Sequence, residues 1–248
     1  MFVPTVPVRL YGVMGVNRLI SLAVIAALAG TSAVARQNTQ SVDGNSGAAQ
    51  VSFSYKFEGP RFYIRVIEIE VGSNGSGELR FTRGESDEVL DCKLKLLPAT
   101  ISRIRALFEA SGFLNSDTEY QGKKNFSHMG WVTLGARRGA RERKARFNFT
   151  TNLQMKELEE IFRGIATQEM SLFDIENAER YQPLDLPKQL DVLENDLKLA
   201  RITEPERLLA ALTEIAADDT QPLIARNQAN RIVDQIRKGK FKSPVKKQ

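Results

Sequence analysis

Residues 62–71 read FYIRVIEIEV, and this stretch decides the fold because apolar and charged side chains alternate along it. In an extended chain, Ile67, Ile69 and Val71 fall on one face, and the intervening glutamates fall on the other. The next segment, GSNGSG at 72–77, is typical of a turn because glycine tolerates positive φ. The stretch therefore predicts a half-buried strand that ends in a hairpin turn.

The same alternation extends to both sides of this strand. It recurs in residues 51–57, 77–83 and 89–96, and polar or glycine-rich segments separate the runs. Alternation of this kind is typical of antiparallel strands with one apolar face. Residues 51–96 therefore predict an antiparallel meander.

The apolar spacing then changes from two residues to that of a helix. The elements predicted in order are a helix ended by Gly112, a hairpin of residues 129–136 and 143–150, and a helix over 151–165 begun by a capping box of Thr151 and Gln154. Adjacent strands with interspersed helices indicate an α+β fold. We predict that residues 51–168 form an antiparallel sheet with two helices on one face.

Beyond this domain no strand pattern remains. Residues 169–237 predict an all-α C-terminal extension of short helices, one ending near Pro183 and another begun by a capping box at Thr203–Glu206. Three amphipathic helices of this length bury little core alone. We expect them to dock on the α+β domain or to leave an apolar groove for a partner. Residues 238–248 predict a basic disordered tail.

The N-terminus has the pattern of a signal peptide. Residues 19–30 read LISLAVIAALAG, Arg18 precedes them, and the small residues Ala33 and Ala35 predict cleavage before Arg36. The run is short for a bilayer-spanning helix, and the alternative is an uncleaved anchor. We expect a signal peptide at 1–35, export to the periplasm or the cell exterior, and no transmembrane segment after its removal. Met1 and Met14 are the two candidate translation starts.

The composition excludes several classes of function. One Cys and one His exclude a disulfide framework and multi-histidine metal sites, and no phosphate loop or dinucleotide motif is present, so we expect no metal and no cofactor. Residues 36–50 are polar and aperiodic and predict a disordered leader. Residues 36–236 carry 27 basic against 30 acidic side chains, so we expect no nucleic-acid partner.

The sole histidine is the one candidate for imidazole acid–base chemistry. His128 follows a polar stretch that contains Asp117 and Glu119, which suggests a hydrolase that uses these three residues. The alternative is a structural loop histidine. Glu68 and Glu70 share one strand face, a spacing that glycoside hydrolysis could use. The simpler interpretation is that both glutamates face water or pair with Arg80 or Lys93.

A basic hairpin is the candidate binding site. Residues 137–146, RRGARERKAR, hold six basic side chains and one acid, and Arg137, Arg138, Arg141 and Arg143 could dock an anionic envelope polymer. The alternative is an ordinary solvated turn.

Two resemblances rest on short motifs. Gly-Glu-Leu-Arg-Phe at 77–81, Ala-Ser-Gly-Phe at 110–113 and Trp-Val-Thr-Leu at 131–134 resemble exported bacterial α+β domains of unknown function. Residues 207–237 resemble a HEAT-type helical pair. The sequence contains no second copy of this pair, whereas stacked-repeat proteins usually need about three units. The resemblances imply bacterial export and an α+β fold, and they imply no chemistry.

Together these patterns lead to two function hypotheses. The first is an exported, non-enzymatic protein that binds an envelope component, either a protein or an anionic polymer, through the helical region or the basic hairpin. The alternative is a hydrolase that uses His128 with carboxylates of the 115–128 loop.

Overall fold

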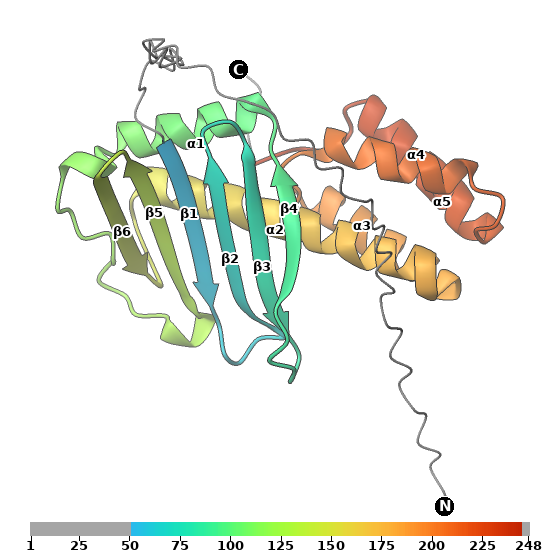
Figure 1. Cartoon of the computed structure of the whole chain (residues 1–248), viewed down its shortest axis with the longest axis horizontal. Helices are drawn as coiled ribbons and strands as arrows, with labels where there is room; N and C mark the ends of the chain where they lie inside the picture. Colours follow the sequence, from blue (N-terminus) through green and yellow to red (C-terminus); the bar gives the residue numbers. More distant parts are fainter. Residues whose placement is uncertain (1–50, 245–248) are drawn as a thin grey trace, which may run out of the picture. The chain divides into compact units, whose positions relative to one another are not determined.

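The computed structural model describes residues 51–244, which belong to one compact unit. The predicted signal peptide, its cleavage site and the leader lie outside the described residues. The fold is α+β, as predicted, with one antiparallel sheet of six strands in the order β4-β3-β2-β1-β5-β6 (Figure 1). The strands are β1 (Val51–Glu58), β2 (Ile64–Gly72), β3 (Ser76–Arg83), β4 (Leu90–Lys95), β5 (Trp131–Arg138) and β6 (Arg141–Phe147).

The register of the sheet turns the sequence alternation into two different faces. Tyr55 of β1 stands opposite Ile69 of β2 and Leu134 of β5, and all three side chains are buried. Lys56, one residue later, stands opposite Glu68 and Thr133 on the other face. Because a shift of one residue would exchange the faces, burial of the apolar row fixes the register.

Two helices cover the apolar face of the sheet. Helix α1 (Pro98–Ala110) and helix α2 (Leu153–Tyr181) lie against the same face (Figure 1). Aromatic side chains of both helices pack on those of the strands. Phe53 stacks on Phe108 of α1 at a centroid distance of 5.3 Å, and Tyr55 stacks on Phe162 of α2 at 5.5 Å. Gly112 follows α1 with φ of 61°, which is the helix stop that the sequence predicts.

The structure differs from the sequence prediction in α2. The two helical segments expected on either side of residue 168 are one helix of 29 residues, which runs past the edge of the sheet (Figure 1). Its N-cap is Asn152, whose side chain accepts a hydrogen bond from the Met155 amide at 3.0 Å, so the predicted Thr151–Gln154 capping box is wrong. The apolar stripe is interrupted because α2 changes partners along its length.

The C-terminal half of α2 carries a second core. The remaining helices are α3 (Leu186–Lys198), α4 (Leu209–Ala217) and α5 (Leu223–Arg237), with short 3-10 turns at Phe113–Asn115, Ser127–Met129, Pro183–Asp185 and Pro205–Leu208. Ile175 and Ala178 of α2 join buried side chains of all three helices in one cluster. The C-terminal helices thus pack on the second half of α2, within residues 169–237, and share no apolar cluster with the sheet among the described residues.

Between the two cores, α2 presents polar side chains to the segment that leads into α4. Gln168 accepts a hydrogen bond from the Glu204 amide at 2.8 Å, and Glu169 forms an ion pair with Arg207. Thr203 donates to the carbonyl of Ile161 at 2.8 Å. We call Gln168, Glu169, Thr203, Glu204 and Arg207 the polar clamp.

The clamp also explains why the predicted capping box at Thr203–Glu206 is wrong. The Thr203 hydroxyl bonds to α2, and Glu204 accepts a hydrogen bond from the Leu97 amide at 2.8 Å, just before α1. Neither side chain is therefore available to cap a helix, and α4 begins only at Leu209 after a 3-10 turn.

The described part of the basic tail contacts the body of the protein, unlike the expected disordered segment. Phe241 packs against the helical core, and the Ser243 hydroxyl donates to the carbonyl of Thr203 at 2.5 Å. Within residues 51–244, no helix combines the length and the apolar character that crossing a membrane requires.

The polar clamp packs closely against α2 at Gly164. A Cβ atom at this position would lie 2.3 Å from the Thr203 hydroxyl oxygen. We expect Gly164→Ala to lower the free energy of unfolding by about 1–2 kcal/mol, because overpacking outweighs the helix propensity that alanine adds. In a Thr203→Ala background the cost should shrink, as measured by urea denaturation. An equal cost in both backgrounds would contradict the packing.

Candidate functional site

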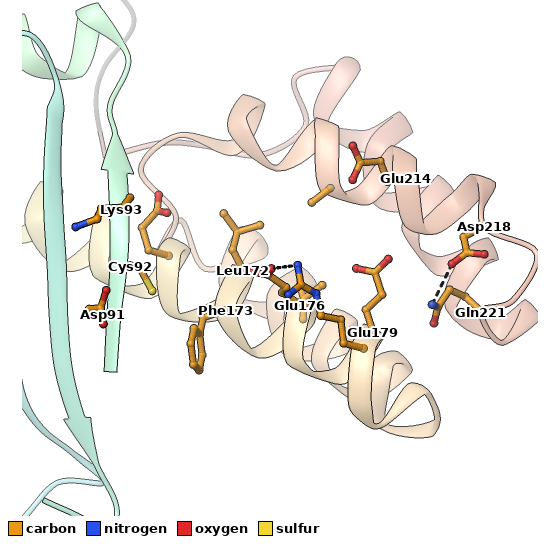
Figure 2. Close-up of a pocket in the computed structure, with 14 residues that line it drawn as sticks. Asp91, Cys92, Lys93, Leu172, Phe173, Glu176, Glu179, Glu214, Asp218 and Gln221 are labelled. Atoms are coloured by element: carbon orange, nitrogen blue, oxygen red, sulfur yellow. Dashed lines mark hydrogen bonds and ion pairs between the residues drawn. The ribbon is translucent and has the colours of Figure 1, made fainter. Parts of the chain in front are cut away.

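A groove lies where the edge of the sheet meets the helical region. It has a volume of about 840 Å³ and is bordered by β4, by the second half of α2 and by α4 with the turn that follows it (Figure 2). Strand β4 contributes Asp91, Cys92 and Lys93 to its wall. Segments that are far apart in the sequence thus meet around one groove.

The groove is strongly acidic. Its two cations are Lys93 and Arg180, and its six carboxylates are Asp91, Glu169, Glu176, Glu179, Glu214 and Asp218. Lys93 is bound to Glu78 at 2.7 Å and Arg180 to Glu176 at 2.5 Å, so neither cation is free to neutralise the rest. The groove therefore carries a net negative charge, which favours cationic partners.

Three of these carboxylates are not held in ion pairs, although Asp91 stands opposite Arg80 in the sheet and the charge of Arg180 partly offsets that of Glu179. Asp91, Glu179 and Glu214 form no ion pair with any residue in the described range. Glu179 of α2 and Glu214 of α4 face each other across the groove (Figure 2). Burial raises the pKa of Glu179, and the negative charges of Asp218 and Glu214 raise it further. A bound cation would relieve this repulsion.

The strand that borders the groove is the edge of the sheet. β4 pairs with β3 through residues 90–95, and within residues 51–244 no further backbone hydrogen bond reaches its outer edge. An open strand edge presents unpaired amide and carbonyl groups that can pair with an added strand. At residues 91–93 these groups lie beside the acidic groove.

A buried polar atom in the groove wall also lacks a partner. Gln221 is 8% exposed, and its amide nitrogen donates to Asp218 at 3.1 Å. Its side-chain oxygen is buried and accepts no hydrogen bond within the described part of the chain. A buried acceptor without a donor is destabilising, and a ligand donor would satisfy it.

The cysteine in the groove is not an activated thiol. Burial raises the pKa of Cys92 to about 11, and the nearby carboxylates, Glu169 and Asp91 first among them, raise it as well. The thiol is therefore protonated at neutral pH, whereas nucleophilic and metal-binding cysteines act as thiolates.

The structure does not bring the three residues of the predicted hydrolase site together. His128 is exposed in the 3-10 turn at Ser127–Met129, where its ring lies 6.0 Å from that of Phe126. Asp117 and Glu119 are exposed, and among the described residues His128 makes no hydrogen bond or ion pair with either. An acid–base site needs such contacts, so this geometry does not favour the hydrolase.

The paired glutamates lie on the face of the sheet that no helix covers. Glu68 lies 3.2 Å from Lys56 and 3.8 Å from Arg80, which agrees with the simpler interpretation of cross-strand pairing. Glu70 is exposed. In residues 51–244 no group of three or more His, Cys, Asp or Glu side chains is placed to hold a metal ion.

The four arginines of the basic hairpin are divided between two faces and bound internally. Arg137 pairs with Glu142 at 3.0 Å, Arg138 pairs with Glu109 at 2.8 Å, and Arg141 donates to Asn115 at 2.5 Å. The single basic patch that the sequence suggests is therefore not formed as expected, because β-strand alternation sends neighbouring side chains to opposite faces.

Arg143 has a structural position that the sequence does not reveal. Its guanidinium donates to the carbonyls of Phe113 at 2.6 Å and Thr118 at 2.5 Å. It also lies 4.8 Å from the ring centroid of Phe113 and 5.2 Å from that of Tyr120. The Arg143 side chain thus connects β6 to the loop that follows α1. Arg143 is therefore not part of the solvated patch that the sequence had suggested.

Comparison with known proteins adds no identification. No protein-family model matches the chain, and no curated protein matches it in sequence.

Sequence reasoning missed the acidic groove because its wall comes from three separate segments. One signal was present within α2: Glu169, Glu176 and Glu179 recur at spacings that place them on one side of a helix. Nothing in the sequence shows that β4 and α4 flank that side.

The different environments of the hairpin arginines predict different stabilities. Arg143→Ala should lower the free energy of unfolding by about 1–2 kcal/mol, because partly buried hydrogen bonds from a charged group and its ring contacts are lost. The matched variant Arg137→Ala should cost about 0.5 kcal/mol or less, as expected for an exposed ion pair. Chemical denaturation of both variants measures the difference, and equal costs would contradict the assignment.

Proposed function

We propose that the protein is an exported binding protein whose acidic groove receives a basic, extended segment of another envelope protein. The observation that carries the proposal is the placement of unpaired carboxylates beside an open strand edge. The carboxylates select positive charge, and the strand edge can bind an extended backbone. Neither the carboxylates nor the open strand edge alone indicates a particular partner. Together they favour an extended, basic peptide segment.

The two features fit the geometry of an added strand. Side chains of an extended peptide alternate between two faces, so every second residue of a strand beside β4 would point the same way. A segment with Lys or Arg at alternate positions could place its cations at Glu179 and Glu214 while its backbone pairs with residues 91–93. Gln221 offers a buried acceptor to one of the donors.

The sign of the charge distinguishes this partner from the anionic polymer considered for the basic hairpin. Arg137, Arg138 and Arg141 already have acceptors within the protein, so binding an anion there would have to displace them. The groove, in contrast, has carboxylates that no internal cation satisfies. A basic protein segment is therefore the better-supported partner.

Export is supported by the N-terminal sequence alone. The apolar run at 19–30 and the small residues Ala33 and Ala35 support cleavage before Arg36. N-terminal sequencing of the native protein should give Arg36 as the first residue. Native protein that retains residues 19–30 would indicate a membrane anchor instead.

The binding proposal is tested with a short peptide that alternates Lys and Thr. Fluorescence anisotropy should show saturable binding to the chain that begins at Arg36. The triple variant Asp91→Asn, Glu179→Gln, Glu214→Gln should bind about tenfold more weakly, since each partly exposed charge contributes about 0.5 kcal/mol. The matched control Glu85→Gln, Glu88→Gln, Glu119→Gln removes the same charge from exposed loops and should bind as the wild type does.

Two further measurements separate strand addition from simple charge attraction. A peptide of the same sequence with N-methylated amides keeps its charge but cannot donate to β4, so it should bind more weakly. Binding should also weaken as the pH falls through the raised pKa values of Glu179 and Glu169, because these carboxylates lose their charge before ordinary ones do. Equal binding by the triple variant and its control would overturn the proposal.

A further inference from the structure

A second cavity lies beneath the apolar face of the sheet, away from the acidic groove. It has a volume of about 550 Å³ and lies between the N-terminal half of α2 and the ends of β1, β2, β5 and β6. This volume falls within the range of cavities that hold small molecules. The cavity uses none of the residues that line the acidic groove.

The cavity wall is mostly aromatic and aliphatic. Phe57 of β1 and Phe126 and Phe149 of the neighbouring loops line it together with Met129. Met129 is 57% exposed, and Phe62 beside it is 40% exposed. Apolar side chains are thus left in contact with solvent at the mouth, and an apolar ligand would remove them from water.

The charged groups of the cavity come from α2, and a tyrosine hydroxyl comes from β1. Glu159 and Arg163 form an ion pair with each other. Burial raises the pKa of the Tyr55 hydroxyl, which keeps it neutral at physiological pH. Lys156 lines the cavity and forms no ion pair with any residue between 51 and 244. With Glu159 and Arg163 neutralising each other, Lys156 leaves one uncompensated positive charge.

We propose that this cavity binds a single-chain amphipathic carboxylate, with the apolar chain among the phenylalanines and the carboxylate at the ammonium of Lys156. The apolar wall provides the affinity for the chain, and the free cation selects an acid over a neutral molecule of the same length. The inference is independent of the proposed function, because the two sites have separate walls.

The test is a titration of the chain that begins at Arg36 with laurate below its micelle concentration. Calorimetry should show saturable binding of one laurate. Dodecanol, which has the same chain length and no charge, should bind about two- to fivefold more weakly, the range expected when one ion pair is lost at an exposed side chain such as Lys156. Absence of saturable laurate binding would overturn the proposal.

One variant and its matched control examine the carboxylate end of the ligand. Lys156→Glu should weaken laurate binding about tenfold or more and leave dodecanol binding unchanged. The matched variant Lys188→Glu reverses an exposed charge on α3 and should bind laurate as the wild type does. Equal weakening by both variants would show a general charge effect and overturn the role of Lys156.

Thr167→Trp places a large ring in the cavity from a half-exposed position on α2 and should abolish binding. Met129→Glu at the exposed mouth gives a second variant in case the first alters folding, and thermal unfolding checks both.

Anionic vesicles form the last arm of the experiment. Binding to vesicles without binding to monomeric laurate would mean a membrane surface site, and it would overturn the cavity assignment.

Discussion

The unbroken course of α2 depends on the burial of Gln168 and Glu169. A glutamate that is 5% exposed is costly unless a cation and hydrogen bonds compensate it. Arg207 supplies the cation, and Gln168 donates to the Glu169 carboxylate at 3.0 Å. Burial nevertheless raises the pKa of Glu169, so compensation is incomplete. Breaking this contact would leave a buried charge at the centre of the longest helix.

The polar clamp joins the two cores and thereby places both candidate sites. One half of α2 packs on the sheet, where Phe162 contacts Tyr55, and the other half packs on the C-terminal helices through Ile175. The acidic groove lies beside the second half, and the aromatic cavity lies beside the first. A single rigid helix therefore sets the distance between β4 and α4 and the opening below the sheet.

Much of the fold could be predicted because its signals are local. The alternation at 62–71 predicted β2, and Gly112 predicted the end of α1. The prediction of two separate helices in place of α2 was wrong. A stripe of apolar residues marks the side of a helix that one surface buries, whereas α2 is buried against two surfaces in succession. The polar residues of α2 between its two apolar stripes have the sequence pattern of a solvent-exposed linker, although Gln168 is fully buried.

The sequence by itself determined the sheet, its two unlike faces and the helices of the C-terminal region, because hydrophobic periodicity acts over a few neighbouring residues. Only the tertiary structure decided the sites. It kept His128 apart from Asp117 and Glu119, bound the hairpin arginines internally, and gathered Asp91, Glu179 and Glu214 from three distant segments. The physical reason is that charge recognition depends on distances in space, and a one-dimensional pattern contains no such distances between segments that meet only after folding.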